Sequence, residues 1–293
     1  MNAALKDLIE VLELENLEQH LFRGQSRNLG GRSVFGGQVL GQALVAASRT
    51  VEHSLAHSVH AYFVRPGDME APIVYDVERI RDGRSFAVRR VHAIQHGRPI
   101  FSMMASFQQP EPGYEHQDSM PDVPPPEELV LESELRTRWL EDCPAPLKPG
   151  YQQELAIEFK PVTPRNPFRP ESMPPQQHIW FRAAGPLPDD PCLHQSVLAY
   201  ASDFNFLGTA MRPHAMSWFE RHVVAATLDH VIWFHRPARL DDWLLYSMHS
   251  PSAQGARGLT QGQIYNRDGE LVASLAQESL MRDTHLAAQQ QDD

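Results

Sequence analysis

Asp203 is the residue whose surroundings most suggest chemistry. It lies in the segment AYASDFNFLG, in an otherwise apolar stretch that predicts a helix. A charged group buried there is costly unless it is paired, so a buried Asp203 would point to a function. An aspartate at the helix end explains the pattern equally well, because Asn205 and Gly208 are typical of helix termination. The residues alone leave both interpretations open.

Thr227 and Gln277 are two further polar candidates, each on a predicted strand. Thr227 lies in AATLDHVIWFHRP, where polar and apolar residues alternate, and Gln277 lies in ASLAQESLMR on the last predicted strand. Taken singly, Thr227 is an ordinary strand residue. An inward-facing Gln277 would need hydrogen-bonding partners. Neither residue identifies a reaction by itself.

The motifs of several common enzyme classes are absent from the sequence. It contains no G-x-S-x-G, no G-x-x-x-x-G-K-[ST] and no G-x-G-x-x-G, so serine hydrolases, P-loop proteins and dinucleotide-binding proteins lack support. The glycines between Gly30 and Gly41 are not followed by a lysine. They favour tight turns and a helix N-terminus over a nucleotide-binding loop.

The 15 histidines raise the question of a metal site. His53, His57 and His60 could be ligands on a helix, but the following AYFVR predicts a strand, in which residues 57 and 60 point to opposite faces. His92 and His96 also lie in a strand-like run that ends at a turn. We therefore expect these histidines to be polar strand and loop residues, with no metal and no cofactor.

Composition limits the class of protein further. The 293 residues suggest two domains or one large one. The net charge of −11 argues against nucleic acid as a partner, because phosphate binding needs a basic surface. Two cysteines form neither a disulfide framework nor a four-ligand zinc site. The N-terminus lacks the apolar core of a secretory signal and no stretch is suited to a bilayer. We expect a cytoplasmic protein without membrane insertion.

Hydrophobic spacing predicts helices and strands in an order that occurs twice. The expected helices cover residues 3–21, 37–50 and 193–206, with a short acidic helix in 127–142. The segment 110–150 holds nine of the 24 prolines, which is typical of a linker. Strands are expected over residues 57–65, 73–81, 85–96, 100–108, 157–159, 178–182, 222–234, 243–250, 258–266 and 271–281.

Sliding the sequence on itself supports a duplication. At an offset of 171, Phe63-x-Arg65-Pro66 falls on Phe234-x-Arg236-Pro237, and Tyr75 falls on Tyr246. Each unit reads as a helix of small residues followed by an antiparallel meander. We predict an N-terminal unit over 1–115, a linker over 116–150 and a C-terminal unit over 151–293.

Several long segments resemble the acyl-CoA thioesterase II family, of the bacterial TesB and peroxisomal type. They are GQSRNLGGRSVFGGQVLGQAL, HSVHAYFVRPGD, YASDFNFL, TLDHVIWFHRP and LVASLAQESLMR, and the resemblance covers about residues 5–283. It implies an α+β double hot-dog fold, in which two tandem units each wrap a curved antiparallel sheet around a long helix. It also implies hydrolysis of fatty acyl-CoA to free acid and CoA. The chain ends in QQQDD rather than in a peroxisomal signal, which fits the cytoplasmic bacterial form.

The resemblance assigns a catalytic role to Asp203, Thr227 and Gln277. Thr227 and Gln277 would orient a water molecule while Asp203, its pKa raised by burial, accepts a proton. The best-shaped oxyanion donors are backbone N–H groups at Gly36, Gly37 and Gln38, where a helix is expected to begin. His57 is a further candidate, for which we favour a structural role.

Two other functions stay open at this point. The first is another hot-dog enzyme resembling an enoyl-CoA hydratase, although its usual Asp/His pair in one short motif cannot be placed. The second is a non-catalytic acyl-CoA-binding protein. Association into a homodimer or homotetramer is also expected, because hot-dog sheets often pair edge to edge and free edges are a liability.

The two halves differ at the positions that carry the proposed chemistry. Aligning the central helices places Val45 opposite Asp203, and the offset of 171 places Ser106 opposite Gln277. The first half then lacks both the acid and the amide. We predict one catalytic site per chain, with its water-activating residues all in the second half.

Overall fold

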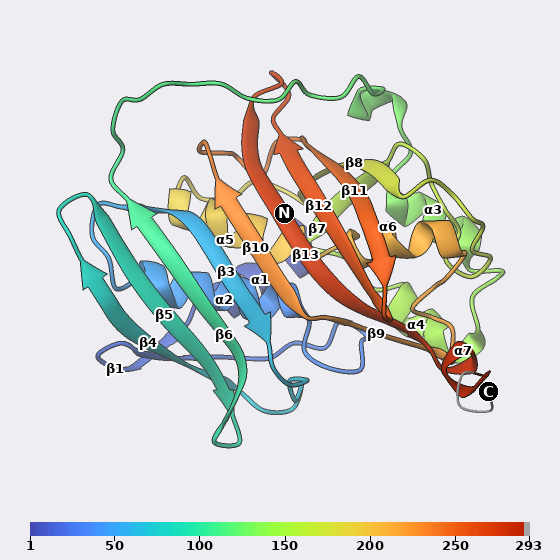
Figure 1. Ribbon diagram of the computed structural model, residues 1–293, viewed down its shortest axis with the longest axis horizontal. Coiled ribbons are helices and arrows are strands. Elements are labelled where there is room, and N and C mark those ends of the chain that lie inside the picture. Colours follow the sequence, from blue (N-terminus) through green and yellow to red (C-terminus); the bar gives the residue numbers. More distant parts are fainter. Residues whose placement is uncertain (290–293) are drawn as a thin grey trace.

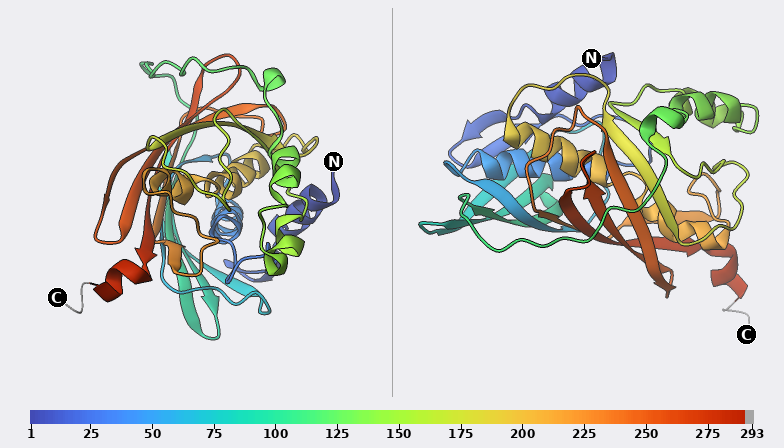
Figure 2. Two further views of the ribbon diagram at one scale, coloured as in Figure 1. Left: turned by 90° about the vertical axis from the view of Figure 1, so that its right-hand side faces the viewer. Right: turned by 90° about the horizontal axis from the view of Figure 1, so that it is seen from above.

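In the computed structural model, which describes residues 1–289, two central helices lie against one long, curved sheet (Figure 1). The helices are α2 (Gly36–Ser48) and α5 (Pro191–Ser202), one from each half of the chain. Figure 2 shows the sheet curling around both. This confirms the expected α+β double hot-dog architecture.

Small residues allow α2 and α5 to lie in direct contact. Ten of the 13 residues of α2 are buried, including three alanines and two glycines. A Cβ on Gly37 would clash with the carbonyl oxygen of Tyr200, and one on Gly41 would lie 3.0 Å from that of Ser196. The helices are therefore antiparallel, and their close approach depends on these glycines.

The sheet contains 13 strands in the described part of the chain. Its order is β1-β2-β4-β5-β6-β3-β10-β13-β12-β11-β8-β7, and β9 pairs with β13. The strand bounds are β1 Glu15–Glu18, β2 Leu21–Gly24, β3 Leu55–Phe63, β4 Ile73–Asp82, β5 Phe86–Gln95, β6 Arg98–Gln108, β7 Ile157–Pro161, β8 Gln176–Ala183, β9 Val223–Thr227, β10 Asp229–Phe234, β11 Leu244–Gln254, β12 Arg257–Tyr265 and β13 Leu271–Asp283.

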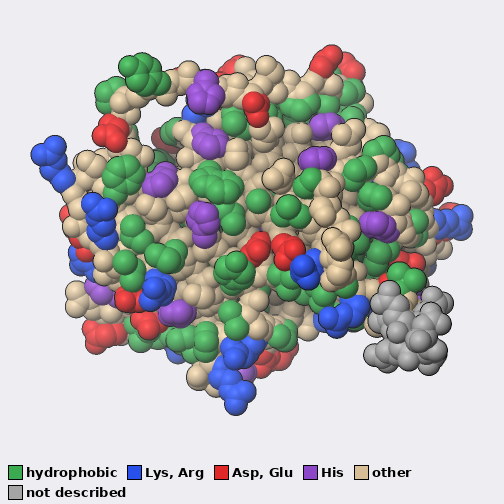
Figure 3. Space-filling view, viewed as in Figure 1, with side chains coloured by type: hydrophobic (Ala, Val, Ile, Leu, Met, Phe, Trp, Pro, Cys, Tyr) green, Lys and Arg blue, Asp and Glu red, His purple; other side chains and the backbone are tan. Residues whose placement is uncertain are grey.

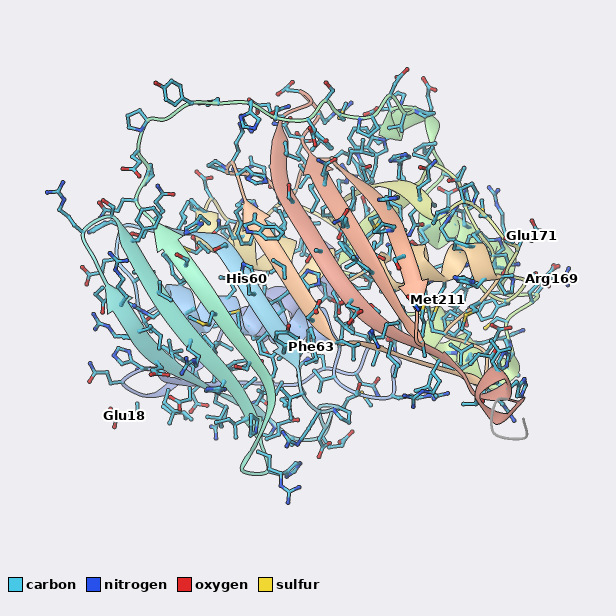
Figure 4. All side chains as sticks on the ribbon, viewed as in Figure 1. Glu18, His60, Phe63, Arg169, Glu171 and Met211 are labelled. Carbon is cyan, nitrogen blue, oxygen red and sulfur yellow. The ribbon has the colours of Figure 1, made fainter. Side chains whose placement is uncertain are left out.

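A pseudo-twofold axis relates the two halves where β3 pairs with β10. His60 pairs with Val231 there, and these numbers differ by the same 171 that the sequence repeat predicted. Figure 4 shows His60 on β3 near the middle of the sheet. The strand order on one side of this junction mirrors the order on the other, so the duplication is a symmetry of the fold.

The register corrects one predicted correspondence. His60 pairs with Met104 in the first half, and its counterpart Val231 pairs with Ala276 in the second. The residue equivalent to Gln277 is therefore Ala105, and the expectation of Ser106 is wrong by one place. The connection between the paired residues Ile264 and Ala273 is one residue longer than the equivalent connection between Ala93 and Phe101, so the turn glycines Gly97 and Gly269 differ by 172 rather than 171.

Three predicted elements are shorter than expected. The first helix, α1 (Ala3–Leu12), ends because the backbone becomes extended at Glu13, and the β1–β2 hairpin then pairs with β4. Asn205 has a φ of 70°, which separates α5 from the short α6 (Phe206–Met211). The predicted strand over 222–234 is divided at Leu228 into β9 and β10.

The linker crosses the sheet before it becomes helical. In Figure 1 the segment after β6 passes over the upper end of the sheet to the second half. Gln117 anchors it by donating to Gly269 O at 2.8 Å and accepting from Leu271 N at 3.0 Å. The helical segments that follow are η1 (Pro126–Glu128), α3 (Glu132–Trp139), η2 (Ala145–Leu147) and α4 (Lys148–Tyr151).

One hydrophobic core extends through both halves, from Leu5 in α1 to Leu275 in β13. The predicted boundaries near 115 and 150 therefore separate units of sequence that share a core, and the division into domains stays an interpretation. The remaining helical elements are η3 (Arg212–His214) and α7 (Thr284–Gln289). Among residues 1–289, no helix is both long and apolar enough to cross a membrane.

Candidate active site

Asp203 caps the C-terminus of α5, and its carboxylate is held from two sides. The Gly37 N–H donates to Oδ2 at 2.8 Å and the Thr227 hydroxyl donates to Oδ1 at 3.1 Å. A carboxylate at a helix C-terminus faces the unfavourable end of the helix dipole. The N-terminus of α2 compensates, because it points an N–H at the same group. Asp203 is thus both a helix-end residue and a partly buried acid.

Thr227 and Gln277 lie beside Asp203, so the structure brings the three predicted residues together. Thr227 is the last residue of β9, and Gln277 is on the paired strand β13. The Gln277 amide nitrogen is 3.3 Å from Thr227 Oγ1 and 2.9 Å from Ser279 Oγ. Gln277 is 1% exposed, and these contacts satisfy an amide that is otherwise costly to bury.

His230 belongs to the same cluster and was missed by the sequence reasoning. It is fully buried. Its Nδ1 lies 2.6 Å from Gln277 Oε1, and its Nε2 lies 2.9 Å from Ser202 Oγ. A signal was present in TLDHVIWF, because residues 230, 232 and 234 alternate inward along β10 and only His230 among them is polar.

Burial favours the neutral forms of both Asp203 and His230: it raises the pKa of the acid and lowers the pKa of the histidine. Burial is the main cause of the raised pKa of Asp203, and it is opposed by the proximity of His230 and by the hydrogen bonds from Thr227 and Gly37. Burial likewise lowers the pKa of His230, against the opposing effect of Asp203. A carboxylate with a raised pKa is a stronger base than a solvated one.

The start of α2 contacts the carboxylate closely. A Cβ on Gly36 would lie 2.7 Å from Asp203 Oδ2 and 3.0 Å from the ring of Phe63. The Gly37 N–H is already bonded to Asp203, and the Gln38 N–H is 3.1 Å from Phe35 O. The turn at Gly36, Gly37 and Gln38 therefore lies next to Asp203, and the Gly37 N–H holds the Asp203 carboxylate in place.

His57 lies apart from this cluster. Its Nε2 is 2.8 Å from Ser106 Oγ, and its ring packs edge-on against Phe86. Burial lowers its pKa. These contacts join β3 to β5 and β6 in the first half, and the structural role of His57 stays a prediction.

An aromatic cluster lines the other side of Asp203. The next residue, Phe204, packs against Phe35 and Phe159 with ring centroids 4.5 and 5.3 Å apart. Phe159 also borders a cavity of about 390 Å³ between β7 and the linker helices. The aromatic rings therefore separate Asp203 from this cavity, which no residue of the Asp203 cluster lines.

One group of possible metal ligands lies near the C-terminal end of β13. Among the described residues, His222, Asp283 and His285 place one possible ligand atom each within 4.8 Å of the others. The two imidazole rings are stacked, with centroids 4.5 Å apart and planes 9° apart. Because the nitrogen lone pairs lie in the ring planes, stacked rings do not converge on one ion. We assign no metal to this group.

Comparisons with known proteins were made for the whole chain. A family model described as "Acyl-CoA thioesterase" matches residues 150–280, and one described as "Acyl-CoA thioesterase N-terminal domain" matches residues 25–108. Acyl-CoA thioesterase 2 of Haemophilus influenzae is 44% identical over 96% of this chain and 99% of its own length. Acyl-coenzyme A thioesterase 8 of Homo sapiens is 46% identical over 93% of this chain and 88% of its own.

A solved structure agrees with these matches. The acyl-CoA thioesterase II TesB2 from Mycobacterium marinum has a TM-score of 0.77 and 44% sequence identity to this chain. The similarity covers 94% of this chain and 98% of that one. Sequence and fold therefore correspond over nearly the full length of both halves.

Proposed function

The chain belongs to the acyl-CoA thioesterase family, and from this premise we propose that it hydrolyses fatty acyl-CoA to free acid and CoA at the Asp203 cluster. The observation that carries the proposal is the contact of Asp203, Thr227 and Gln277 across three separate elements. Residues from a helix end and two strands meet around one carboxylate, which the repeat alone does not require.

The proposed reaction uses water and no cofactor. Thr227 and Gln277 orient a water molecule and Asp203 removes its proton as the water oxygen attacks the thioester carbonyl carbon. The new C–O bond forms first, and collapse of the tetrahedral intermediate breaks the C–S bond and releases the CoA thiolate. The proton held by Asp203 then leaves to solvent or to the thiolate.

The start of α2 stabilises the negative charge in this proposal. The carbonyl oxygen becomes an oxyanion beside Gly36, Gly37 and Gln38. The Gly37 N–H is bonded to Asp203 and the Gln38 N–H to Phe35 O, so the stabilisation comes from the positive end of the helix dipole. The aromatic wall at Phe204 and Phe159 provides an apolar surface for the acyl chain, with the adjoining cavity beyond it.

The arrangement of His230 argues against a hydratase. That reaction needs an Asp/His pair that both reach the substrate, and Asp203 and His230 do lie in one cluster. His230, however, is fully buried, and both of its ring nitrogens are hydrogen-bonded to protein side chains. It acts behind Gln277 and does not face a substrate.

An assay over a panel of saturated acyl-CoA chain lengths tests the proposal directly. We expect release of free CoA with wild-type protein and its loss with Asp203→Asn. Binding without turnover would support the non-catalytic alternative. Asp203 could instead attack the thioester carbonyl directly and form an acyl anhydride. Single turnover in ¹⁸O-labelled water tests this, because water that opens the anhydride at the aspartyl carbon leaves the label in the protein, whereas attack by water on the thioester leaves it in the acid product.

Self-association is part of the proposal, as a homodimer or homotetramer. The edge strand β1 is fully exposed and has the sequence ENLE, while the other edge, β7, contacts α3. Acidic or covered edges oppose edge-to-edge pairing. Figure 3 shows apolar side chains over the outer sheet face, where Tyr62, Met104 and Trp233 are exposed. A light-scattering mass of one chain, 33.2 kDa, would contradict association.

A further inference from the structure

His230 connects the end of α5 to the amide of Gln277. Its imidazole is enclosed between β10, β13 and α5, with the ring of Phe206 at 5.6 Å. The contact from Nδ1 to Gln277 Oε1 is 2.6 Å and the contact from Nε2 to Ser202 Oγ is 2.9 Å. A buried histidine with both nitrogens engaged has a fixed ring orientation and one preferred pattern of protons.

The direction of each hydrogen bond follows from Asp203. An ionised carboxylate only accepts, so the Thr227 hydroxyl must donate its proton to Asp203. Thr227 Oγ1 is then left to accept from the Gln277 NH₂ group. This places Gln277 Oε1 toward His230, and His230 Nδ1 must carry the proton that it donates to this oxygen.

The opposite arrangement would disable the same residues. With the proton on Nε2 alone, Nδ1 could only accept, and the Gln277 amide would turn its NH₂ toward the histidine. Gln277 Oε1 would then compete with Asp203 for the Thr227 proton. Both the base and the amide donor would lose the orientation that water activation requires.

We propose that His230 is a positioning residue, whose Nδ1–H holds the Gln277 amide with its NH₂ group toward Thr227 Oγ1 and Ser279 Oγ, beside the reacting water. The inference rests on the function proposed above and adds to it a residue that never touches substrate. Ser202, the residue before Asp203, holds the other end of the ring. Its Oγ is 2.9 Å from both His230 Nε2 and Ala199 O, and with the ring proton on Nδ1 the single hydroxyl proton of Ser202 is donated to Nε2. The network therefore starts and ends at two adjacent residues, Ser202 and Asp203, at the C-terminal end of α5.

Two substitutions separate the two ring nitrogens. The amide nitrogen of Asn can occupy the place of Nδ1, and that of Gln can occupy the place of Nε2. His230→Asn keeps the donor to Gln277, whereas His230→Gln keeps the contact to Ser202. We expect kcat to fall roughly 10²-fold in His230→Gln and only a few-fold in His230→Asn, with KM little changed in both. Ser202→Ala, the matched control, should resemble His230→Asn.

If kcat falls equally in His230→Asn and His230→Gln, and the fall parallels a loss of melting temperature, the histidine only fills space. That result would overturn the proposal. The reference variant is Gln277→Ala. If Gln277→Ala keeps full turnover, the proposed function of the site fails. If Gln277→Ala is inactive and His230→Gln is not, only the role of His230 fails.

A measurement on the unmodified protein covers the case in which the variants do not fold. In ¹⁵N-histidine NMR, the His230 signals can be assigned from its position next to Gln277 and should show a protonated Nδ1. A neutral imidazole with an unprotonated Nδ1 would overturn the proposal, because such a ring cannot donate to Gln277 Oε1.

Discussion

The two halves of the sheet contain the same structural position twice, and only one copy carries polar groups. The pseudo-twofold axis at His60 and Val231 relates β3 to β10. Aligning the sequences of α2 and α5 relates Val45 to Asp203. Each member of the Asp203 cluster then has a counterpart in the first half. The counterparts of Asp203, Thr227, His230 and Gln277 are Val45, Ala56, Val59 and Ala105.

The first-half position is closed by a side chain. Gln195 is the counterpart of Gly37, and its amide bonds the backbone of Ala56, accepting from N at 3.2 Å and donating to O at 2.8 Å. Where Gly37 leaves its N–H for a carboxylate, Gln195 occupies the equivalent space. The comparison teaches that the fold needs the helix, the strands and their close approach in both halves, while chemistry needs four polar residues in one.

The largest effect is expected from removing the acid. Asp203→Asn keeps the shape but cannot accept a proton, so turnover should fall on the order of 10³-fold. In wild type, kcat/KM should fall on the acid side with a pKa above the usual 3.8, because burial raises the pKa of Asp203. Steady-state kinetics against pH measure both. Retained turnover in Asp203→Asn would remove the distinction between the halves.

The stability of the same variant gives an independent check. Because the folded state raises the pKa of Asp203, it binds a proton more tightly than the unfolded chain, and the stability contribution falls as pH rises above 3.8. Asp203→Asn should therefore raise the melting temperature at pH 7 relative to wild type. The gain should shrink as pH falls toward 3.8. A loss of melting temperature together with activity would indicate a structural aspartate.

A smaller loss is expected at Thr227, where the proposal needs only a hydroxyl. Thr227→Ser should keep substantial activity, and Thr227→Val should lose roughly 10²-fold, because the donor to Asp203 disappears while the shape is kept. The measurement is kcat/KM for both variants. Equal activity of Thr227→Ser and Thr227→Val would exclude Thr227 from the site, so that it would contribute no more to catalysis than its counterpart Ala56.

Gly36 tests the approach of α2 to the carboxylate. Gly36→Ala places a methyl group 2.7 Å from Asp203 Oδ2, so Asp203 must shift. We expect kcat to fall about tenfold, equivalent to about 1.4 kcal/mol of transition-state stabilisation. The matched control is Gly113→Ala, where a Cβ would meet no atom within 4 Å. Unchanged kinetics in both variants would show that the start of α2 is dispensable.

Much of this difference could be predicted from the sequence, because it depends on residue type at corresponding positions. The repeat, the meanders and the replacement of Asp203 by Val45 follow from spacing alone. The offset of 171 placed Ser106 opposite Gln277 because one extra residue in the turn changes the register without changing the pattern; the spacing of 172 between the turn glycines Gly97 and Gly269 was the signal for Ala105.

The contacts of buried polar residues were the other part that the sequence could not provide. His230 occupies an inward strand position that an apolar residue normally fills, and only the packing of three elements shows its partners. Gln195 likewise reads as an ordinary helix residue, because its partner Ala56 is 139 positions away. Long-range hydrogen bonds leave little trace in local spacing.

The smallest effect on turnover is expected from removing the Gln195 side chain, which fills the position in the first half that corresponds to the Asp203 site. Gln195→Ala removes both hydrogen bonds to Ala56 and leaves a buried N–H and carbonyl to find other partners, which should lower stability by about 1–3 kcal/mol. No polar group of the Asp203 cluster is touched, so kcat should stay at the wild-type value.

Titration with a non-hydrolysable acyl-CoA analogue should give one equivalent per chain in both wild type and Gln195→Ala, since Val45 and Ala105 offer nothing that recognises a thioester. Two equivalents in wild type would contradict a single site. A second equivalent that appears only in Gln195→Ala would instead show that Gln195 alone keeps the first half closed, and that its apolar residues still form a binding surface.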